Sequence, residues 1–208
     1  MLTITTVIVI ITSITSFMAF SNQNMIDKLI FYPPAINRDK EWYRFFSNGL
    51  IHADMQHLLF NMISLYSFGR FVERDFNDIF GNAGKVYYTL MYVSALAICL
   101  IPTYIKQKDN YYYRSLGASG AVSAVIFAGL FLEPTLKIWS IIPGFLFGPI
   151  YLIMTGYLIK QGRDNINHSA HFWGSLYGLI FILATGYALS QYDLVATFIQ
   201  NIRDYISF

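Results

Sequence analysis

Six long apolar segments dominate the sequence, and they constrain the fold more than any other feature does. Each has about the 17–25 residues that an α-helix needs to cross the hydrocarbon core of a bilayer. The six segments cover residues 2–20, 55–71, 86–105, 116–132, 138–159 and 170–189. In lipid, a helix satisfies all of its own backbone polar groups. The pattern therefore predicts an all-α, multi-pass membrane protein with one domain over residues 1–208.

The composition agrees with a membrane protein. Of the 208 residues, 55% are hydrophobic and only 12% are charged, whereas about a quarter of the residues of a soluble domain are charged. The net charge of +2 is too small to indicate nucleic acid as a partner. Cys99 is the only cysteine, so an intrachain disulfide is excluded.

The segments between and beside the spans are also informative. Residues 2–20 lack the basic leader and the cleavage site of a signal peptide, so we expect a retained first span. The long connection 21–54 contains Trp42 and many other aromatic residues, which favours a loop that is partly embedded in the interface. Pro143 and Pro149 predict a kinked fifth span. Residues 191–208 have helical amphipathic spacing, which is typical of a helix on the membrane surface.

Polar residues gather where three of the spans begin. His52 and His57 flank the start of the second span, Ser119 opens the fourth, and His168 and His171 flank the start of the sixth. Because consecutive spans alternate in direction, the second, fourth and sixth all begin at the same membrane face. Ionisable groups inside a membrane are costly, so they indicate a functional site at that face.

A serine and a histidine form the first candidate pair. Small residues accompany both of them: Gly117, Gly120, Gly174 and Gly178. His171 shares one helical face with Gly174 and Gly178, and a small-xxx-small face lets another helix approach closely. Close packing of the fourth and sixth spans would bring the His171 imidazole to the Ser119 hydroxyl and activate it as a nucleophile. The alternative is ordinary helix packing, with Ser119 bonded to its own backbone.

A second candidate pair lies in "HLLFN". His57 and Asn61 are four residues apart and share one face of the second span. Their side-chain N–H groups could stabilise a developing oxyanion, and Ser119 lies in the first turn of its helix, where free backbone N–H groups do the same. The alternative is that these polar side chains only join neighbouring helices.

These motifs, in this order on the second, fourth and sixth spans, resemble the rhomboid family of intramembrane serine proteases. The resemblance covers nearly the whole chain. It implies a six-helix rhomboid fold, a Ser119–His171 dyad and cleavage of transmembrane substrates without metal or cofactor. It also implies an oxyanion site formed by His57, Asn61 and the Ser119 N–H.

Looser matches and departures accompany the main motifs. Arg44 resembles the arginine of the family's Trp–Arg pair, but Tyr43 stands at the tryptophan position. Glu73 resembles the glutamate of a Gly-xxx-Glu-xxx-Gly pattern in which Asn77 replaces the last glycine. Ser123 stands where many rhomboids have an aromatic residue that packs on the catalytic histidine. This last departure concerns how rigidly the histidine is held, not the chemistry.

The predicted function is therefore an intramembrane serine endopeptidase, a multi-pass protein in the cell membrane of a bacterium, whose partners are transmembrane substrates and lipid. The family orientation puts the N-terminus in the cytoplasm and opens the site outward. The charges disagree, because the inner segments would then carry five Lys and Arg residues and the outer ones nine.

Two other functions stay open at this point. A catalytically silent rhomboid relative would bind membrane clients without cutting them. A metal transporter or metalloenzyme is the second, because five acceptable ligands could converge: His52, Asp54, His57, His168 and His171. The metal alternative leaves Asn61 and the Gly-Ala-Ser-Gly motif unexplained.

Overall fold

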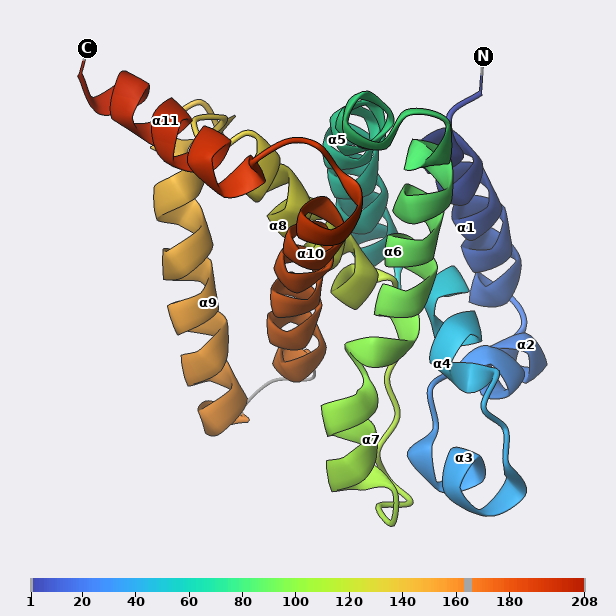
Figure 1. The fold of residues 1–208 in the computed structure, drawn as a ribbon. Helices are drawn as coiled ribbons and strands as arrows, with labels where there is room; N and C mark the ends of the chain where they lie inside the picture. The colour runs from blue at the N-terminus through green and yellow to red at the C-terminus, as the bar shows by residue number, and fades with distance from the viewer. Residues whose placement is uncertain (1, 163–165, 208) are drawn as a thin grey trace.

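The computed structural model describes residues 2–162 and 166–207, and these form a bundle of helices (Figure 1). The longer helices are α1 (Ile4–Phe20), α5 (Met55–Phe80), α6 (Gly84–Ile98), α8 (Ser119–Leu132), α9 (Gly144–Gln161) and α10 (His168–Leu189). The shorter ones are α2 (Gln23–Leu29), α3 (Pro33–Asp39), α4 (Arg44–Ser47), α7 (Ile101–Gln107) and α11 (Leu194–Ile206). Two 3₁₀ turns, η1 (Asn48–Leu50) and η2 (Gly81–Ala83), and a hairpin of β1 (Lys137–Ile138) and β2 (Ile142–Pro143) complete the described elements.

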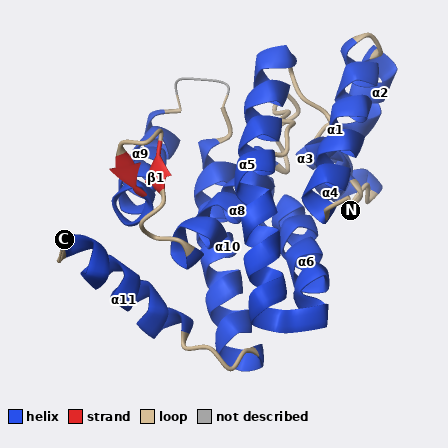
Figure 2. Ribbon diagram, turned by 90° about the horizontal axis from the view of Figure 1, so that it is seen from above, coloured by secondary structure: helices blue, strands red, loops and turns tan. Residues whose placement is uncertain are grey.

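Helix α8 forms the centre of the bundle. Eleven of its fourteen residues are buried, and it packs against α5, α6 and α10. Viewed along the bundle, α9 stands at one side and α1 at the opposite side (Figure 2). The core between these helices is formed by large apolar side chains such as Leu65, Tyr88 and Ile182.

Glycines let α8 and α10 touch backbone to backbone. A Cβ atom on Gly174 would lie 2.1 Å from the carbonyl oxygen of Gly120, and one on Gly178 would lie 2.0 Å from that of Ala124. No side chain fits at such distances. The small residues of the two helices therefore set their separation, as small-xxx-small faces do in membrane bundles.

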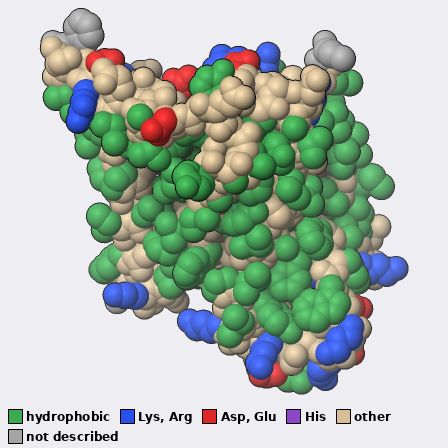
Figure 3. Space-filling view, viewed as in Figure 1, with side chains coloured by type: hydrophobic (Ala, Val, Ile, Leu, Met, Phe, Trp, Pro, Cys, Tyr) green, Lys and Arg blue, Asp and Glu red, His purple; other side chains and the backbone are tan. Residues whose placement is uncertain are grey.

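The outer surface has the character of a protein in lipid. Apolar side chains cover the middle of the molecule, while most charged side chains lie towards its two ends (Figure 3). Among the described residues, the stretches 55–107 and 168–189 are long and apolar enough to cross a bilayer, and α1 and α8 are apolar but shorter. The count of six spans stays a prediction.

Two of the predicted spans are interrupted by proline. The fifth was expected from residue 138, but its first residues form the β1–β2 hairpin, whose turn contains Trp139 and Ser140 at positive φ. Pro143 is the N-cap of α9 and not a kink, which corrects the prediction, whereas Pro149 does lie inside that helix. In the third span, α6 ends at Ile98 and α7 restarts before Pro102, because proline lacks the N–H that a continuous helix needs.

The helix that contains the second predicted span is longer than that span. This helix, α5, runs on from residue 71 to Phe80 and becomes amphipathic. In this extension Val72 and Phe76 are buried, whereas Arg74 and Asp78 are exposed. The mean hydropathy of the sequence falls after residue 71 although the helix continues. Hydropathy therefore predicts which part of the helix can lie in lipid, but not where the helix ends.

A buried carboxylate joins α1 to this part of α5. Glu73 accepts hydrogen bonds at 2.9 Å from the backbone N–H groups of Ile4 and Thr5, and a third at 2.9 Å from the Thr5 hydroxyl. The Tyr88 hydroxyl lies 2.8 Å from that of Thr5 and extends the network to α6. A negative charge at the first turn of α1 also interacts favourably with the helix dipole.

We expect Glu73→Gln to destabilise the fold by about 2–4 kcal/mol, because an amide N–H₂ would face the N–H donors of α1 and the charge would be lost. Unfolding by denaturant in detergent micelles measures this. The matched control is Asp78→Asn, an exposed carboxylate on the same helix, which should change stability by less than about 0.5 kcal/mol. Equal stability of the two variants would contradict the role of Glu73.

Candidate active site

The serine and the histidine singled out in the sequence lie in contact. Ser119 is the first residue of α8, and His171 lies in the first turn of α10. The Nε2 atom of His171 is 2.7 Å from the Oγ atom of Ser119, a distance typical of a strong hydrogen bond. The contact lies one turn from the point where Gly174 meets Gly120, so the close approach of the two helices brings the side chains together.

A cavity opens beside this pair. It has a volume of about 650 Å³, which is large enough for several residues of an extended peptide. Its wall includes His57 and Asn61 from α5, Ser119 from α8, and Asn167 and His171 at the start of α10. The starts of α5, α8 and α10 therefore meet at one cavity, and each is the lower end of its helix in Figure 1.

His57 presents an N–H donor on this wall. The backbone N–H of Ala53 points to its Nδ1 atom at 3.5 Å, so the ring proton is assigned to Nε2. The ring lies against Gly117, where a Cβ atom would be 2.7 Å and 2.9 Å from Cε1 and Nε2 of His57. Gly117 has φ +118°, a backbone conformation that other residues rarely adopt. Glycine is thus needed here both for the turn and for the imidazole.

Asn61 is buried, and it lies one helical turn after His57 on α5. One N–H of its amide donates to the carbonyl oxygen of His57 at 2.9 Å. An amide has two N–H donors, so the second stays available on the cavity side of the helix. His57 and Asn61 therefore offer one side-chain donor each near Ser119, whose own backbone N–H lies in the first turn of α8 and lacks an intrahelical acceptor.

The segment before Ser119 is held by the loop that precedes α5. Asn48 accepts the N–H of Gly117 at 3.0 Å through its backbone oxygen, and its side chain donates to the carbonyl of Arg44 at 2.8 Å. The buried Arg44 guanidinium in turn donates to two carbonyls, those of Asp27 and Ile30, both at 2.8 Å, and pairs with Glu41. Arg44, which the sequence singled out, thus organises the first loop rather than the cavity.

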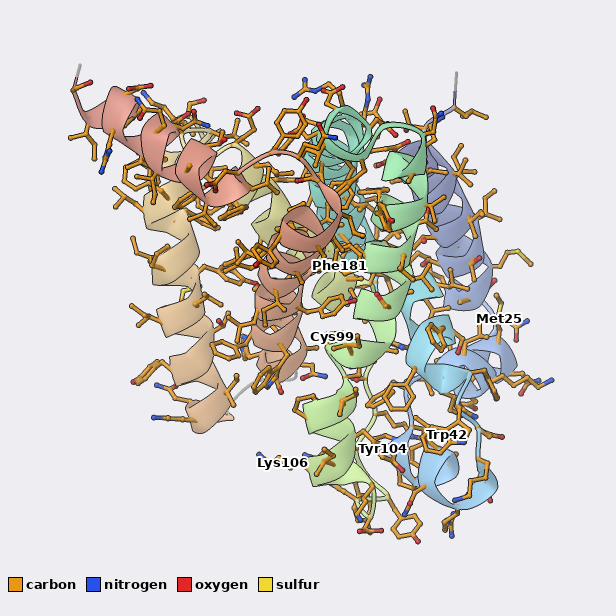
Figure 4. The ribbon with its side chains drawn as sticks, in the orientation of Figure 1. Met25, Trp42, Cys99, Tyr104, Lys106 and Phe181 are labelled. Atoms are coloured by element: carbon orange, nitrogen blue, oxygen red, sulfur yellow. The ribbon has the colours of Figure 1, made fainter. Side chains whose placement is uncertain are left out.

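The first loop also packs on α7 through aromatic rings. The rings of Trp42 and Tyr104 lie 6.0 Å apart, and Figure 4 shows them side by side. Trp42 also stacks on Phe45, at 6.2 Å. The aromatic residues of the first loop therefore hold it against the end of the bundle that carries the cavity.

His52 is a second anchor of the same segment, and its tautomer follows from its partners. The N–H of Ala118 donates to Nε2 at 3.3 Å, so the proton is on Nδ1. Nδ1 lies 3.0 Å from the Ser16 hydroxyl, which itself donates to the carbonyl of Leu50 at 2.9 Å. His52 is 1% exposed. It therefore joins α1 to the residue before Ser119 and must be neutral to do so.

Because of His52, we expect the stability of the fold to decrease at acidic pH. The pKa of His52 is lowered from its ordinary value to about 3, chiefly by burial and secondarily by His57, against the opposite effect of Asp54. Above about pH 7 the folded and unfolded chains both carry the neutral ring. Below about pH 6.5 the unfolded chain binds a proton that the folded chain excludes, so folding weakens by up to about 1.4 kcal/mol per pH unit.

Melting temperatures between pH 5 and pH 8 test this expectation. The wild-type protein should lose stability towards pH 5 more steeply than His52→Gln, which has no titrating ring. Equal slopes in the two proteins would contradict it.

One departure from the rhomboid pattern has a structural counterpart. Ser123, which stands where many rhomboids have an aromatic residue, is buried in α8 one turn after Ser119. The Tyr151 ring of α9 lies 5.6 Å from the ring of Phe127, which stands one turn after Ser123 on α8. Aromatic rings from α8 and α9 therefore meet about one helical turn after Ser123.

The alternative of a metal site finds no geometric support. In residues 2–162 and 166–207, no three His, Cys, Asp or Glu side chains lie close enough to hold one ion. The rings of His52 and His57 are 4.9 Å apart, and those of His168 and His171 are 6.1 Å apart. Both ring nitrogens of His52 already have protein partners.

Comparison with known proteins agrees with the motifs. Residues 39–188 match the family model described as the Rhomboid domain. The chain is 32% identical over 142 residues to RHOMBOID-like protein 12, mitochondrial, from Arabidopsis thaliana, which is 62% of this chain and 42% of that protein. It is 30% identical over 140 residues to the putative rhomboid protease YdcA from Bacillus subtilis, which is 64% of this chain and 62% of that protein.

A third relative is the rhomboid protease GlpG from Haemophilus influenzae. The identity is 32% over 99 residues, which is 47% of this chain and 45% of that protein. The matched regions thus cover roughly half of each relative's own length. The family model covers well over half of the present chain, and the three relatives agree with it. The resemblance noted in the motifs is confirmed: this chain belongs to the rhomboid family.

Proposed function

We propose that this protein is an intramembrane serine endopeptidase that cleaves transmembrane-helix substrates through a Ser119–His171 dyad. The observation that carries the proposal is the 2.7 Å contact between His171 Nε2 and Ser119 Oγ at the wall of a cavity of about 650 Å³. A serine is a weak nucleophile unless a base lies within hydrogen-bond reach. Two of the three relatives are named as proteases, which supports the same reaction.

The dyad would work in two steps. Ser119 Oγ attacks the scissile carbonyl while His171 Nε2 takes its proton and then gives it to the leaving amine. Water then attacks the acyl-enzyme ester, with His171 again accepting a proton and returning it to Ser119. In each step the oxyanion accepts hydrogen bonds from the Ser119 backbone N–H, His57 Nε2 and Asn61 Nδ2. The residues present need no metal or cofactor for this sequence.

The protein is an integral membrane protein, as its family and its apolar helices indicate. We place it in the cell membrane of a bacterium, with six spans, the N-terminus in the cytoplasm and the site opening outward. Two of the relatives are bacterial and one is mitochondrial. The substrates would be membrane proteins whose spanning helix unwinds where it reaches the cavity.

The test is cleavage of a reporter in lipid vesicles. The reporter carries a spanning helix that contains glycine and alanine, and a fluorophosphonate probe labels an activated serine. We expect cleavage together with labelling of Ser119, located by mass spectrometry. A protein that binds the reporter but neither cuts it nor reacts with the probe would instead be a silent, client-binding relative, and the proposal would be wrong.

Asn61→Ala should lower kcat by about 10²-fold with a smaller change in KM, because its hydrogen bond to the oxyanion strengthens in the transition state. Reporter kinetics in vesicles measure both constants. The matched control is Ser67→Ala, an exposed polar residue on the same helix, which should keep wild-type kinetics. A rise in KM with unchanged kcat would contradict the oxyanion role.

A further inference from the structure

Asn167 lies directly before the first turn of α10, the helix that carries His171. It is the N-cap of α10, and its side-chain oxygen accepts the backbone N–H of Ala170 at 3.1 Å. The same oxygen lies 3.2 Å from the Thr103 hydroxyl of α7, which donates to it. The backbone oxygen of Asn167 accepts the N–H of His171 at 3.3 Å. Asn167 is thus tied both to the base-bearing turn and to the neighbouring helix.

These contacts fix which way the amide points. A flipped amide would set its N–H₂ against the N–H of Ala170, two donors face to face, so the oxygen must be the atom that caps the helix. The nitrogen is then directed away from the cap. Within the described parts of the chain, this Asn167 Nδ2 atom is buried and has no hydrogen-bond partner.

The unpaired donor belongs to the wall around the nucleophile. Asn167 lines the catalytic cavity together with Ser119 and His171. It also lines, again with Ser119, a second, small cavity of about 20 Å³. Most buried amide groups have partners, so one left without a partner at such a place calls for an explanation. No step of the dyad mechanism uses it.

We propose that the side-chain N–H₂ group of Asn167 donates a hydrogen bond to a peptide carbonyl of the substrate beside the scissile bond. This inference rests on the protease function proposed above. A spanning helix that unwinds for cleavage exposes carbonyl oxygens that have lost their own N–H partners, which is costly in a membrane. The unpaired N–H₂ of Asn167 and these unpaired carbonyls satisfy one another.

The position of the donor adds to this view. His57 and Asn61 line the cavity from α5, whereas Asn167 lines it from the start of α10. A peptide lying between them would have donors on both sides: His57 and Asn61 for the oxyanion, and Asn167 for a neighbouring carbonyl. Asn167 therefore binds the substrate backbone without taking part in proton transfer.

Asn167→Ser and Asn167→Asp test the donor separately from the cap. Both residues are good N-caps and retain an oxygen for Ala170, but neither has the amide N–H₂. We expect kcat/KM for the spanning reporter to fall about tenfold in both variants, mainly through KM, as for one lost hydrogen bond. Labelling of Ser119 by a fluorophosphonate, which carries no peptide carbonyl, should proceed at the wild-type rate in Asn167→Ser.

Thr103→Val is the matched control. It removes the other partner of the Asn167 oxygen but leaves the amide donor, so reporter cleavage should stay close to wild type. Wild-type cleavage by both Asn167 variants would overturn the inference, as would an equal loss of cleavage and labelling, which would indicate a structural role. A wild-type protein that is neither labelled at Ser119 nor active would instead overturn the protease function itself, and this inference with it.

Discussion

Ser119→Ala should abolish cleavage of the spanning reporter, with kcat falling by at least about 10⁴-fold, because the Ser119 oxygen is the proposed nucleophile that forms the acyl-enzyme. In the structure the Ser119 hydroxyl is the group that lies 2.7 Å from His171 Nε2. The fold should be unaffected, since alanine keeps the helix and removes only a hydroxyl at the cavity wall. Reporter cleavage in vesicles and fluorophosphonate labelling measure the loss.

Two further variants make this prediction sharper. The double variant Ser119→Ala with His171→Ala should lose no more activity than Ser119→Ala alone, because residues that act as a unit are not additive. Ser175→Ala is the control: its hydroxyl donates to the His171 carbonyl at 2.8 Å along the same helix and faces no substrate. It should keep most of the activity. Wild-type turnover by Ser119→Ala would show that another group is the nucleophile.

The pairing of Ser119 with His171 could be predicted because it depends on topology and on residue size. The alternation of spans brings the starts of the second, fourth and sixth to one face, and Gly174 and Gly178 mark the side of the sixth that approaches its neighbour. The structure has these starts at one end of the bundle and the two side chains in contact. Both predictions required only the alternating direction of the spans and the helical spacing of the glycines. A single sequence is enough to give both.

The helix ends could not be predicted from hydropathy alone. Ile138, Trp139 and Ile142 are as apolar as the residues of a span, yet they belong to the hairpin before α9. An apolar run indicates that the side chains can lie in lipid, but it does not indicate the backbone conformation. A hairpin near the membrane interface and a spanning helix can both have such a sequence. Pro102 and Pro143 were the signals that could have placed the breaks, because each restricts the helix in which it stands.

The residues that hold the active site in place were also not predicted, for a different reason. His52 was noted at the start of the second span but was given a specific role only as a metal ligand, and Asn48 and Asn167 were not singled out. Their roles come from partners far away in the chain, such as Ser16 with His52 and Thr103 with Asn167. An asparagine just before a helix predicts an N-cap, so Asn167 had a local signal. Nothing local predicts that its amide nitrogen would lack a partner.

The contact between α8 and α10 leads to the second large effect. Gly174→Val should lower kcat/KM by at least about 10³-fold while the secondary structure persists, because a reacting geometry displaced by about 1 Å already costs about 10²-fold. The first side-chain carbon would lie 2.1 Å from the Gly120 backbone oxygen. A backbone oxygen cannot rotate away, so the two helices must separate next to the dyad.

The same change should also weaken the fold, by about 1–3 kcal/mol, because overpacked cores strain their neighbours. Gly156→Val is the matched control in α9: a Cβ there would meet only Phe172, at 3.8 Å, an ordinary contact. It should leave reporter kinetics nearly unchanged. If Gly174→Val cleaved the reporter as fast as Gly156→Val does, the dyad would not depend on the close packing of α8 and α10. The 2.7 Å contact between Ser119 and His171 would then owe its geometry to other parts of the bundle.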